Sequence, residues 1–184
     1  FYKYYSIQVQ DKTLKIAVVT LPAARMYMSC SHYLVTQDKL DYDSVFESML
    51  VLAEKEYHPS GVVDIKISSD VRNFVDLNHT KLHRLLEKSF TFMGIHPGNT
   101  LSTAQRQAVW VHFTKFELAN HIMEAINPQS YNFSCKEAID RGPISASYYH
   151  LIKSFLSNSP MTQNEFERSI DIASANVRGR GVNY

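Results

Sequence analysis

Apolar residues recur every three or four positions through the middle of the chain, which is the period of an amphipathic helix. Three such stretches predict helices over residues 43–57, 80–93 and 102–126, and Asp43 or Ser44 is the expected N-cap of the first helix. The predicted buried faces are Val45, Met49, Leu52 and Ala53; Leu82, Leu85, Leu86 and Phe90; and Ala108, Val109, Phe116, Ala119, Ile122, Met123 and Ile126.

Shorter stretches alternate or concentrate β-branched and aromatic residues, as strands do. YSIQVQ (5–10) and TLKIAVVTL (13–21) predict two strands joined by a hairpin at residues 11–12. VVDIKIS (62–68) has the alternation of a half-buried strand, and YNFS (131–134) predicts a short buried strand.

The C-terminal part of the chain predicts two more helices. ISASYYHLIKSFL (144–156) follows Pro143, a residue favoured in the first turn of a helix. Thr162 and Glu165 have the spacing of a capping box and should start the last helix. Together these patterns predict one helix-rich domain over residues 1–184, of the α/β or α+β class, with a small sheet.

Composition narrows the function classes. Of the 184 residues, 45% are hydrophobic, and 19 Lys and Arg stand against 18 Asp and Glu, so the net charge gives no reason to expect a nucleic-acid partner. Two cysteines are too few for a disulfide scaffold and favour a reducing, cytoplasmic location. No apolar run is long enough to span a bilayer. The chain starts at Phe1 without a signal-peptide pattern, and we expect it to be an excerpt of a longer protein.

The stretch SCKEAIDRGPIS (134–145) combines a cysteine and an arginine at a spacing that suits phosphate chemistry. A loop between a strand and a helix can point its N–H groups at an anion, and the positive end of the helix adds to the field. Both effects favour the thiolate of Cys135, the nucleophilic form. Arg141 can hold two phosphate oxygens with its planar fork. Attack by Cys135 would give a phosphocysteine that water hydrolyses, without a metal or any other cofactor.

Residues 135–141 match the CX5R signature and resemble the cysteine-dependent phosphatases. The Asp140-Arg141 pair resembles that of phosphoinositide phosphatases of the Sac and myotubularin types, and of secreted inositide phosphatases of intracellular bacterial pathogens. Lys136 is similar to the loop lysine of those bacterial effectors, and an acidic residue at the position of Glu137 also occurs in Sac and myotubularin loops. The resemblance covers only this short motif.

The resemblance implies a role for each matched residue. Cys135 would be the nucleophile and Arg141 the phosphate clamp, while Asp140 would be an acid/base or loop-ordering residue. Lys136 would contact a neighbouring inositol phosphate. The partner would then be a phosphorylated small molecule or lipid headgroup, reached in the host cytosol or at a membrane surface if the protein is a secreted effector.

Two positions depart from the family pattern. Ala138 stands where many family loops have glycine, and Gly142 stands where Ser or Thr usually contacts the cysteine sulfur. Ser145 or Ser147 is the candidate to supply that hydroxyl. The predicted substrate-binding set is therefore Lys136, Gly142 and Ser145.

A second function class is a non-enzymatic effector or interaction module that binds a host protein through helical surfaces. A third is a cysteine hydrolase that pairs Cys135 or Cys30 with a distant histidine. Cys30 and His32 also lie two residues apart, although a buried Cys30 is the favoured interpretation.

Two further sets of residues have an ordinary interpretation that we favour. His79 and His83 have a spacing on a predicted helix that can hold zinc, but no Glu motif or Cys pair accompanies them, which favours solvated helix histidines and no metal. Arg178 and Arg180 stand among glycines and are able to approach an anionic headgroup at a membrane surface. A solvated basic tail is the favoured interpretation.

Overall fold

Helices dominate the computed structural model, which describes residues 16–22, 38–55, 65–134 and 141–178, the last six of them as backbone only. The helices are α2 (Tyr42–Glu54), α3 (Ser69–Phe74), α4 (His79–Phe92), α5 (Thr103–His112), the π-helix η2 (Phe113–Glu117), α6 (Leu118–Ile126), α7 (Arg141–Leu156) and α8 (Gln163–Arg178). The strands are β1 (Leu40–Asp41) and β2 (Thr100–Leu101). The predicted helix-rich α+β class is confirmed for this part of the chain, where no helix is long and apolar enough to cross a membrane.

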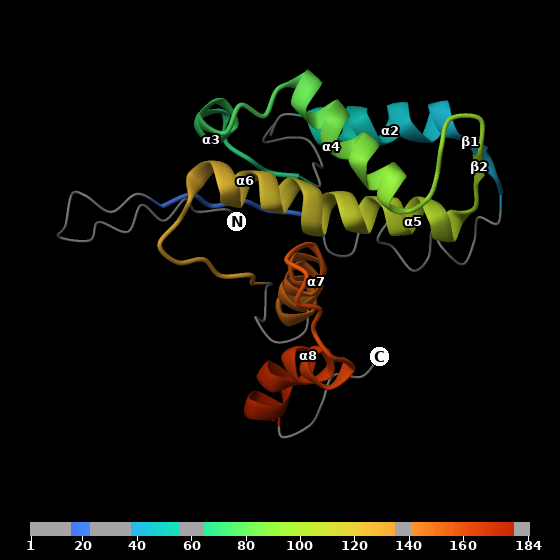
Figure 1. The fold of residues 1–184 in the computed structure, drawn as a ribbon. Coiled ribbons are helices and arrows are strands. Elements are labelled where there is room, and N and C mark those ends of the chain that lie inside the picture. The colour runs from blue at the N-terminus through green and yellow to red at the C-terminus, as the bar shows by residue number, and fades with distance from the viewer. Residues whose placement is uncertain (1–15, 23–37, 56–64, 135–140, 179–184) are drawn as a thin grey trace.

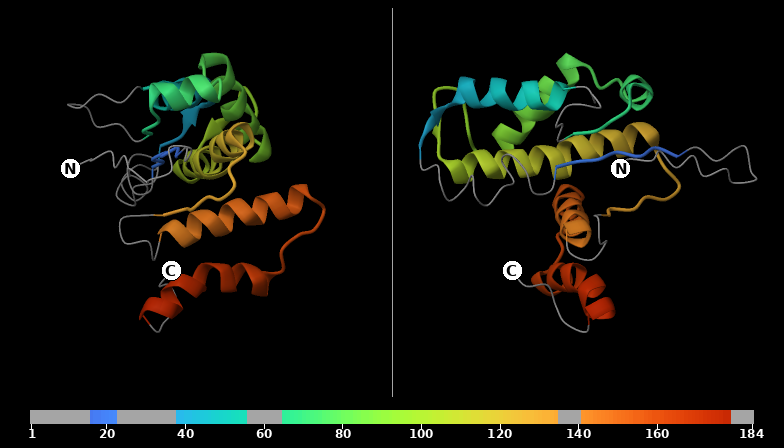
Figure 2. Two further views of the ribbon diagram at one scale, coloured as in Figure 1. Left: turned by 90° about the vertical axis from the view of Figure 1, so that its left-hand side faces the viewer. Right: turned by 180° about the vertical axis from the view of Figure 1, so that it is seen from behind.

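The helices form layers on either side of one long helix. Figure 1 shows α5, η2 and α6 running end to end across the middle of the molecule, with α2 and α4 on one side and α7 and α8 on the other. The two further views in Figure 2 keep α7 between the long helix and α8. The long helix is therefore shared by two packing regions.

The strands are short and antiparallel. In the β1–β2 pair, Leu40 lies opposite Leu101. Thr20 and Lys66 form an isolated antiparallel bridge, with both N···O distances at 2.9 Å. The predicted strands 13–21 and 62–68 thus meet at a single described residue pair, while residues 5–12 lie outside the described chain.

Helix α2 begins earlier than the sequence suggests. Its N-cap is Asp41, whose carboxylate accepts a hydrogen bond from the Ser44 N–H at 2.9 Å, so the prediction of Asp43 or Ser44 as the cap was wrong. The reason is tertiary. Pairing in β1 holds Asp41 extended, and the next residue, Tyr42, is buried against Phe90 of α4 with ring centroids 4.7 Å apart.

The long helix has the predicted extent and an unpredicted turn. Ser102 and Gln105 form a reciprocal capping box at its start, and Asn127 ends it with a positive φ of 47°. Within η2 the Leu118 N–H bonds to the carbonyl of Phe113, five residues back, so the helix holds one extra residue in this turn.

The long helix contributes apolar side chains to two clusters around the π turn. Phe113 belongs to the larger core, which α2 and α4 share. Phe116 and Ala119 belong to a second, smaller cluster with Tyr149 and Ile152 of α7. One helix can therefore pack against α4 on one side and α7 on the other.

Helices α7 and α8 form a hairpin beneath the long helix. Pro143 lies in the first turn of α7, and the capping box of Thr162 and Glu165 starts α8, as predicted. The hydroxyl of Ser169 on α8 donates to that of Ser147 on α7 at 2.7 Å. This hydrogen bond joins the two helices to each other.

No strand forms at residues 131–134, so that prediction was wrong. Tyr131 is 47% exposed, and its ring meets that of Phe133 edge-on at 5.8 Å. Both rings also lie against Tyr149 of α7. The two aromatic side chains therefore pack on a helix instead of alternating across a sheet.

Candidate anion-binding site at the start of helix α7

Arg141 is the first residue of α7, a helix of 16 residues, and its side chain is exposed. This places the predicted phosphate clamp at the positive end of a helix. Gly142 is buried in the same turn, and the hydroxyl of Ser145 donates to the carbonyl of Arg141 at 2.8 Å. The other predicted residues of the motif, at positions 135–140, lie outside the described chain, including Cys135, Lys136 and Asp140.

Lys115 brings a second positive charge to this end of α7. It projects from η2, which packs directly against α7, and it is only partly exposed. Burial, with a smaller contribution from the charge of Arg141, lowers the pKa of Lys115 from 10.5 to about 8. Among the described residues, no carboxylate forms an ion pair with either side chain. The positive charge of Arg141 thus acts on the partly buried Lys115 of the neighbouring η2.

A buried polar contact joins the last residue of α5 to the middle of α7. His112 is fully buried, and its Nδ1 lies 2.8 Å from the hydroxyl of Tyr148. Its Nε2 is 3.7 Å from a carboxylate oxygen of Glu117, five residues later across the π turn. Burial, with a smaller contribution from Glu117, raises the pKa of Tyr148 to about 12, so the phenol stays protonated. Phe92 stacks on His112 with ring centroids 4.0 Å apart.

Two more polar contacts tie α7 to α6. The hydroxyl of Tyr149 donates to the side-chain oxygen of Asn120 at 3.1 Å, and the ammonium group of Lys153 lies 3.4 Å from Glu124. With the Tyr148 contact, they spread along two turns of α7. The Tyr148 and Tyr149 contacts are the more buried of the three and join α7 to the long helix.

The hydroxyl groups of both serines proposed to replace the missing loop hydroxyl already form hydrogen bonds. Ser145 bonds back to its own helix, at the carbonyl of Arg141. Ser147 is 2% exposed and accepts a hydrogen bond from Ser169 of α8. Ser145 is the nearer of the two to Arg141 in sequence. A rotation about its χ1 angle would break the hydrogen bond to the Arg141 carbonyl and free the hydroxyl.

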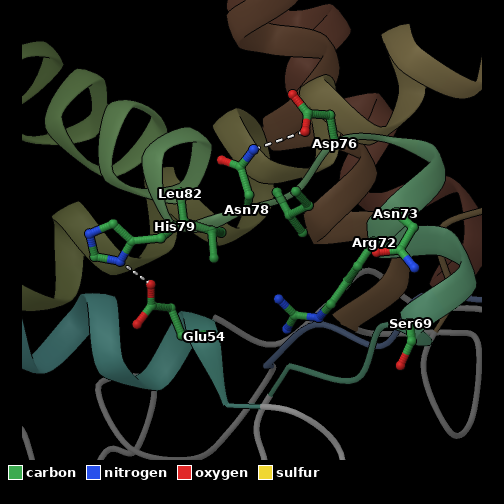
Figure 3. Close-up of a pocket in the computed structure, with 9 residues that line it drawn as sticks. Glu54, Ser69, Arg72, Asn73, Asp76, Asn78, His79 and Leu82 are labelled. Carbon is green, nitrogen blue, oxygen red and sulfur yellow. Dashed lines mark hydrogen bonds and ion pairs between the residues drawn. The ribbon is translucent and has the colours of Figure 1, made fainter.

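A separate polar cavity lies between α3, the end of α2 and the start of α4. It has a volume of about 370 Å³ and is shown in Figure 3. Arg72, 8% exposed, reaches into it and donates to the carbonyl of Ala53 at 3.1 Å, at the C-terminal end of α2. Glu54 and His79 face each other on one wall and form an ion-pair contact through Nδ1 of the imidazole. Arg72 thus has a structural role at the end of α2.

The sequence analysis missed Lys115, although a signal for it was present. Lys115 stands seven residues after Ala108 and four before Ala119, which places it on the predicted apolar stripe of the long helix. A lysine at such a position is forced toward the protein interior. By contrast, the contact of His112 with Tyr148 joins residues 36 apart, and no local pattern indicates it.

Comparison with known proteins gives no relative. No protein-family model, no curated protein and no solved structure matches this chain. Within the described residues, no group of three or more His, Cys, Asp or Glu side chains gathers as a metal site would require.

Proposed function

We propose that this chain is a cysteine-dependent phosphatase acting on a phosphoinositide or a related phosphate ester. The observation that carries the proposal is the position of Arg141 in the first turn of α7, with the partly buried Lys115 on η2 packed against the same helix. A partly buried cation beside a like charge costs folding free energy, and a bound phosphate dianion would offset that cost. Cys135, which carries the candidate nucleophilic thiol, stands six residues before Arg141 in the sequence.

The proposed reaction has two steps. The thiolate of Cys135 attacks phosphorus, the ester P–O bond breaks, and the leaving oxygen takes up a proton, for which Asp140 is the candidate donor. Water then attacks the phosphocysteine, which releases inorganic phosphate and the thiolate. Arg141 holds two non-bridging oxygens as charge develops on them. Lys115 adds positive charge from η2, and Lys136 contacts a neighbouring phosphate of the headgroup.

Phosphate release from a panel of phosphoinositides and one aryl phosphate tests the proposal. We expect Cys135→Ser to abolish turnover and Arg141→Ala to reduce it at least 100-fold. Lys115→Met should reduce turnover about tenfold, since its charge lies beside the clamp. Arg168→Ala and Lys153→Met, on exposed faces of α8 and α7, are the matched controls and should retain activity. A well-folded wild type without activity on any substrate would overturn the proposal.

A non-enzymatic interaction module is the second candidate, and one observation favours it. Large apolar side chains are exposed on the α7–α8 hairpin, namely Ile144 (42%), Phe155 (58%), Leu156 (63%) and Ile172 (61%). Exposed apolar groups of this kind are typical of surfaces that bind helices or other proteins. A host protein that binds the wild type but not Phe155→Ser/Leu156→Ser, with no phosphate release, would favour this candidate.

A further inference from the structure

Two histidines lie one helical turn apart on an exposed face of α4. His79 is the first residue of the helix, and His83 follows four positions later, so both side chains leave the helix in nearly the same direction. Their ring centroids are 6.4 Å apart. Both residues are exposed, and the side chain of His79 is 67% accessible. An ion in solvent can therefore reach both rings.

Glu54 at the end of α2 orients the first of these rings. Its carboxylate contacts Nδ1 of His79, across 25 residues of sequence. A carboxylate at Nδ1 keeps the proton on that nitrogen, so the lone pair of the neutral ring lies on Nε2. Figure 3 shows the two side chains facing each other between the helices. This carboxylate–imidazole pair is the arrangement that orients many metal-binding histidines and increases their basicity.

Phe46 restrains the second ring. The centroids of Phe46 and His83 are 4.7 Å apart with the rings tilted by 57°, which packs one face of the imidazole on α2. Contacts from α2 therefore hold both histidines, one polar and one aromatic. The entropy lost when a metal fixes two mobile side chains is correspondingly smaller.

We propose that His79 and His83 form a binding site for a divalent transition-metal ion of the zinc class, with Glu54 as the orienting carboxylate. Metal–nitrogen distances of about 2.0–2.1 Å and an angle near tetrahedral need ring centroids roughly 5 Å apart. A small χ rotation of the exposed His79 ring closes the difference from 6.4 Å. Water molecules complete the coordination, because no third metal-ligating side chain gathers here among the described residues. Imidazole ligands select zinc, nickel or copper over magnesium and calcium.

Zinc titration of the whole chain, followed by calorimetry and by the imidazole ¹H–¹³C signals, tests this proposal. We expect one equivalent to bind, with the signals of both rings shifted. His79→Ala and His83→Ala should each weaken zinc affinity at least tenfold. His96→Ala, which replaces an exposed histidine after the end of α4, should leave the affinity unchanged. Glu54→Ala should cost 10- to 100-fold, and Glu54→Gln should cost less because the amide oxygen still accepts the Nδ1–H bond.

Three outcomes would overturn the proposal. They are the absence of one-equivalent binding, binding that His83→Ala leaves unchanged, and zinc that shifts the signals of only one of the two rings. The titration is repeated in a Cys30→Ser/Cys135→Ser variant, so that thiolates take up none of the metal. Magnesium should produce no response, and zinc binding should weaken at pH 5, where protons compete for the imidazoles. Circular dichroism of each variant confirms that the fold is retained.

Discussion

Replacing Lys115 by methionine should stabilise the protein at neutral pH. Lys115 lies in η2 against α7, and burial together with the charge of Arg141 lowers its pKa from 10.5 to about 8. The folded protein therefore carries this ammonium group at a cost whenever the pH is below 8. Methionine keeps a long apolar side chain and removes both the desolvation cost and the repulsion.

The size and the pH dependence of the effect follow from the pKa. A drop in pKa from 10.5 to about 8 corresponds to an upper bound of roughly 3 kcal/mol, and we expect a gain of about 1–3 kcal/mol from Lys115→Met at pH 7. Because the folded-state pKa is the lower one, the unfolded state binds more protons between pH 8 and pH 10.5. Wild-type stability therefore rises across that window, and the gain from Lys115→Met shrinks as the pH increases.

Urea unfolding of wild type and Lys115→Met at pH 7 and pH 9.5 measures this difference. Lys153→Met is the matched control, since Lys153 is an exposed lysine paired with Glu124, and we expect it to be neutral or slightly destabilising at both pH values. A loss of stability for Lys115→Met at pH 7, or a gain that is the same at pH 9.5, would refute the argument that Lys115 is charged at a cost.

Three other contacts that stabilise the fold are tested by substitution. Tyr148→Phe removes the partner of the buried His112 Nδ1 and should cost about 1–3 kcal/mol in thermal or urea unfolding, and a cost near zero would contradict the buried contact. Arg106→Met removes hydrogen bonds to the carbonyl and carboxylate of Asp38 and to a buried backbone carbonyl of β2, and should cost about 2–4 kcal/mol. Thr162→Ala should lower stability by about 0.5–2 kcal/mol through loss of the α8 cap, whereas Thr162→Ser should be nearly neutral.

Local patterns predicted the helices well because both their periodicity and their end signals are local. The stretch from Ser102 to Ile126 is helical over its predicted length, and the capping boxes at Ser102 and Thr162 are present. The cap of α2 was misplaced by two residues because strand pairing holds Asp41. A local pattern cannot contain that information.

Strands and the long-range parts of the site were predicted poorly for the same reason. Residues 131–134 have strand composition, but they pack on Tyr149 of α7 and pair with no described strand. The π turn lies where the long helix contacts both the larger core and α7, and no local pattern indicates it. The role of Arg141 as a phosphate clamp stays a prediction from the CX5R motif, while the partial burial of Lys115 against α7 became visible only in the structure.

The most direct test of the proposed function is the alkylation rate of Cys135 by iodoacetamide at pH 6, followed peptide by peptide with mass spectrometry. Cys30, alkylated in a parallel sample of the urea-unfolded protein, is the reference for an ordinary thiol. An ordinary thiol is about 0.3% thiolate at this pH, so a phosphate-binding loop should make Cys135 react at least tenfold faster than Cys30 in the unfolded chain. Inorganic phosphate should slow the reaction in the wild type and have no effect in Arg141→Ala. A Cys135 that reacts slowly and at the same rate with or without phosphate would contradict the proposed nucleophile.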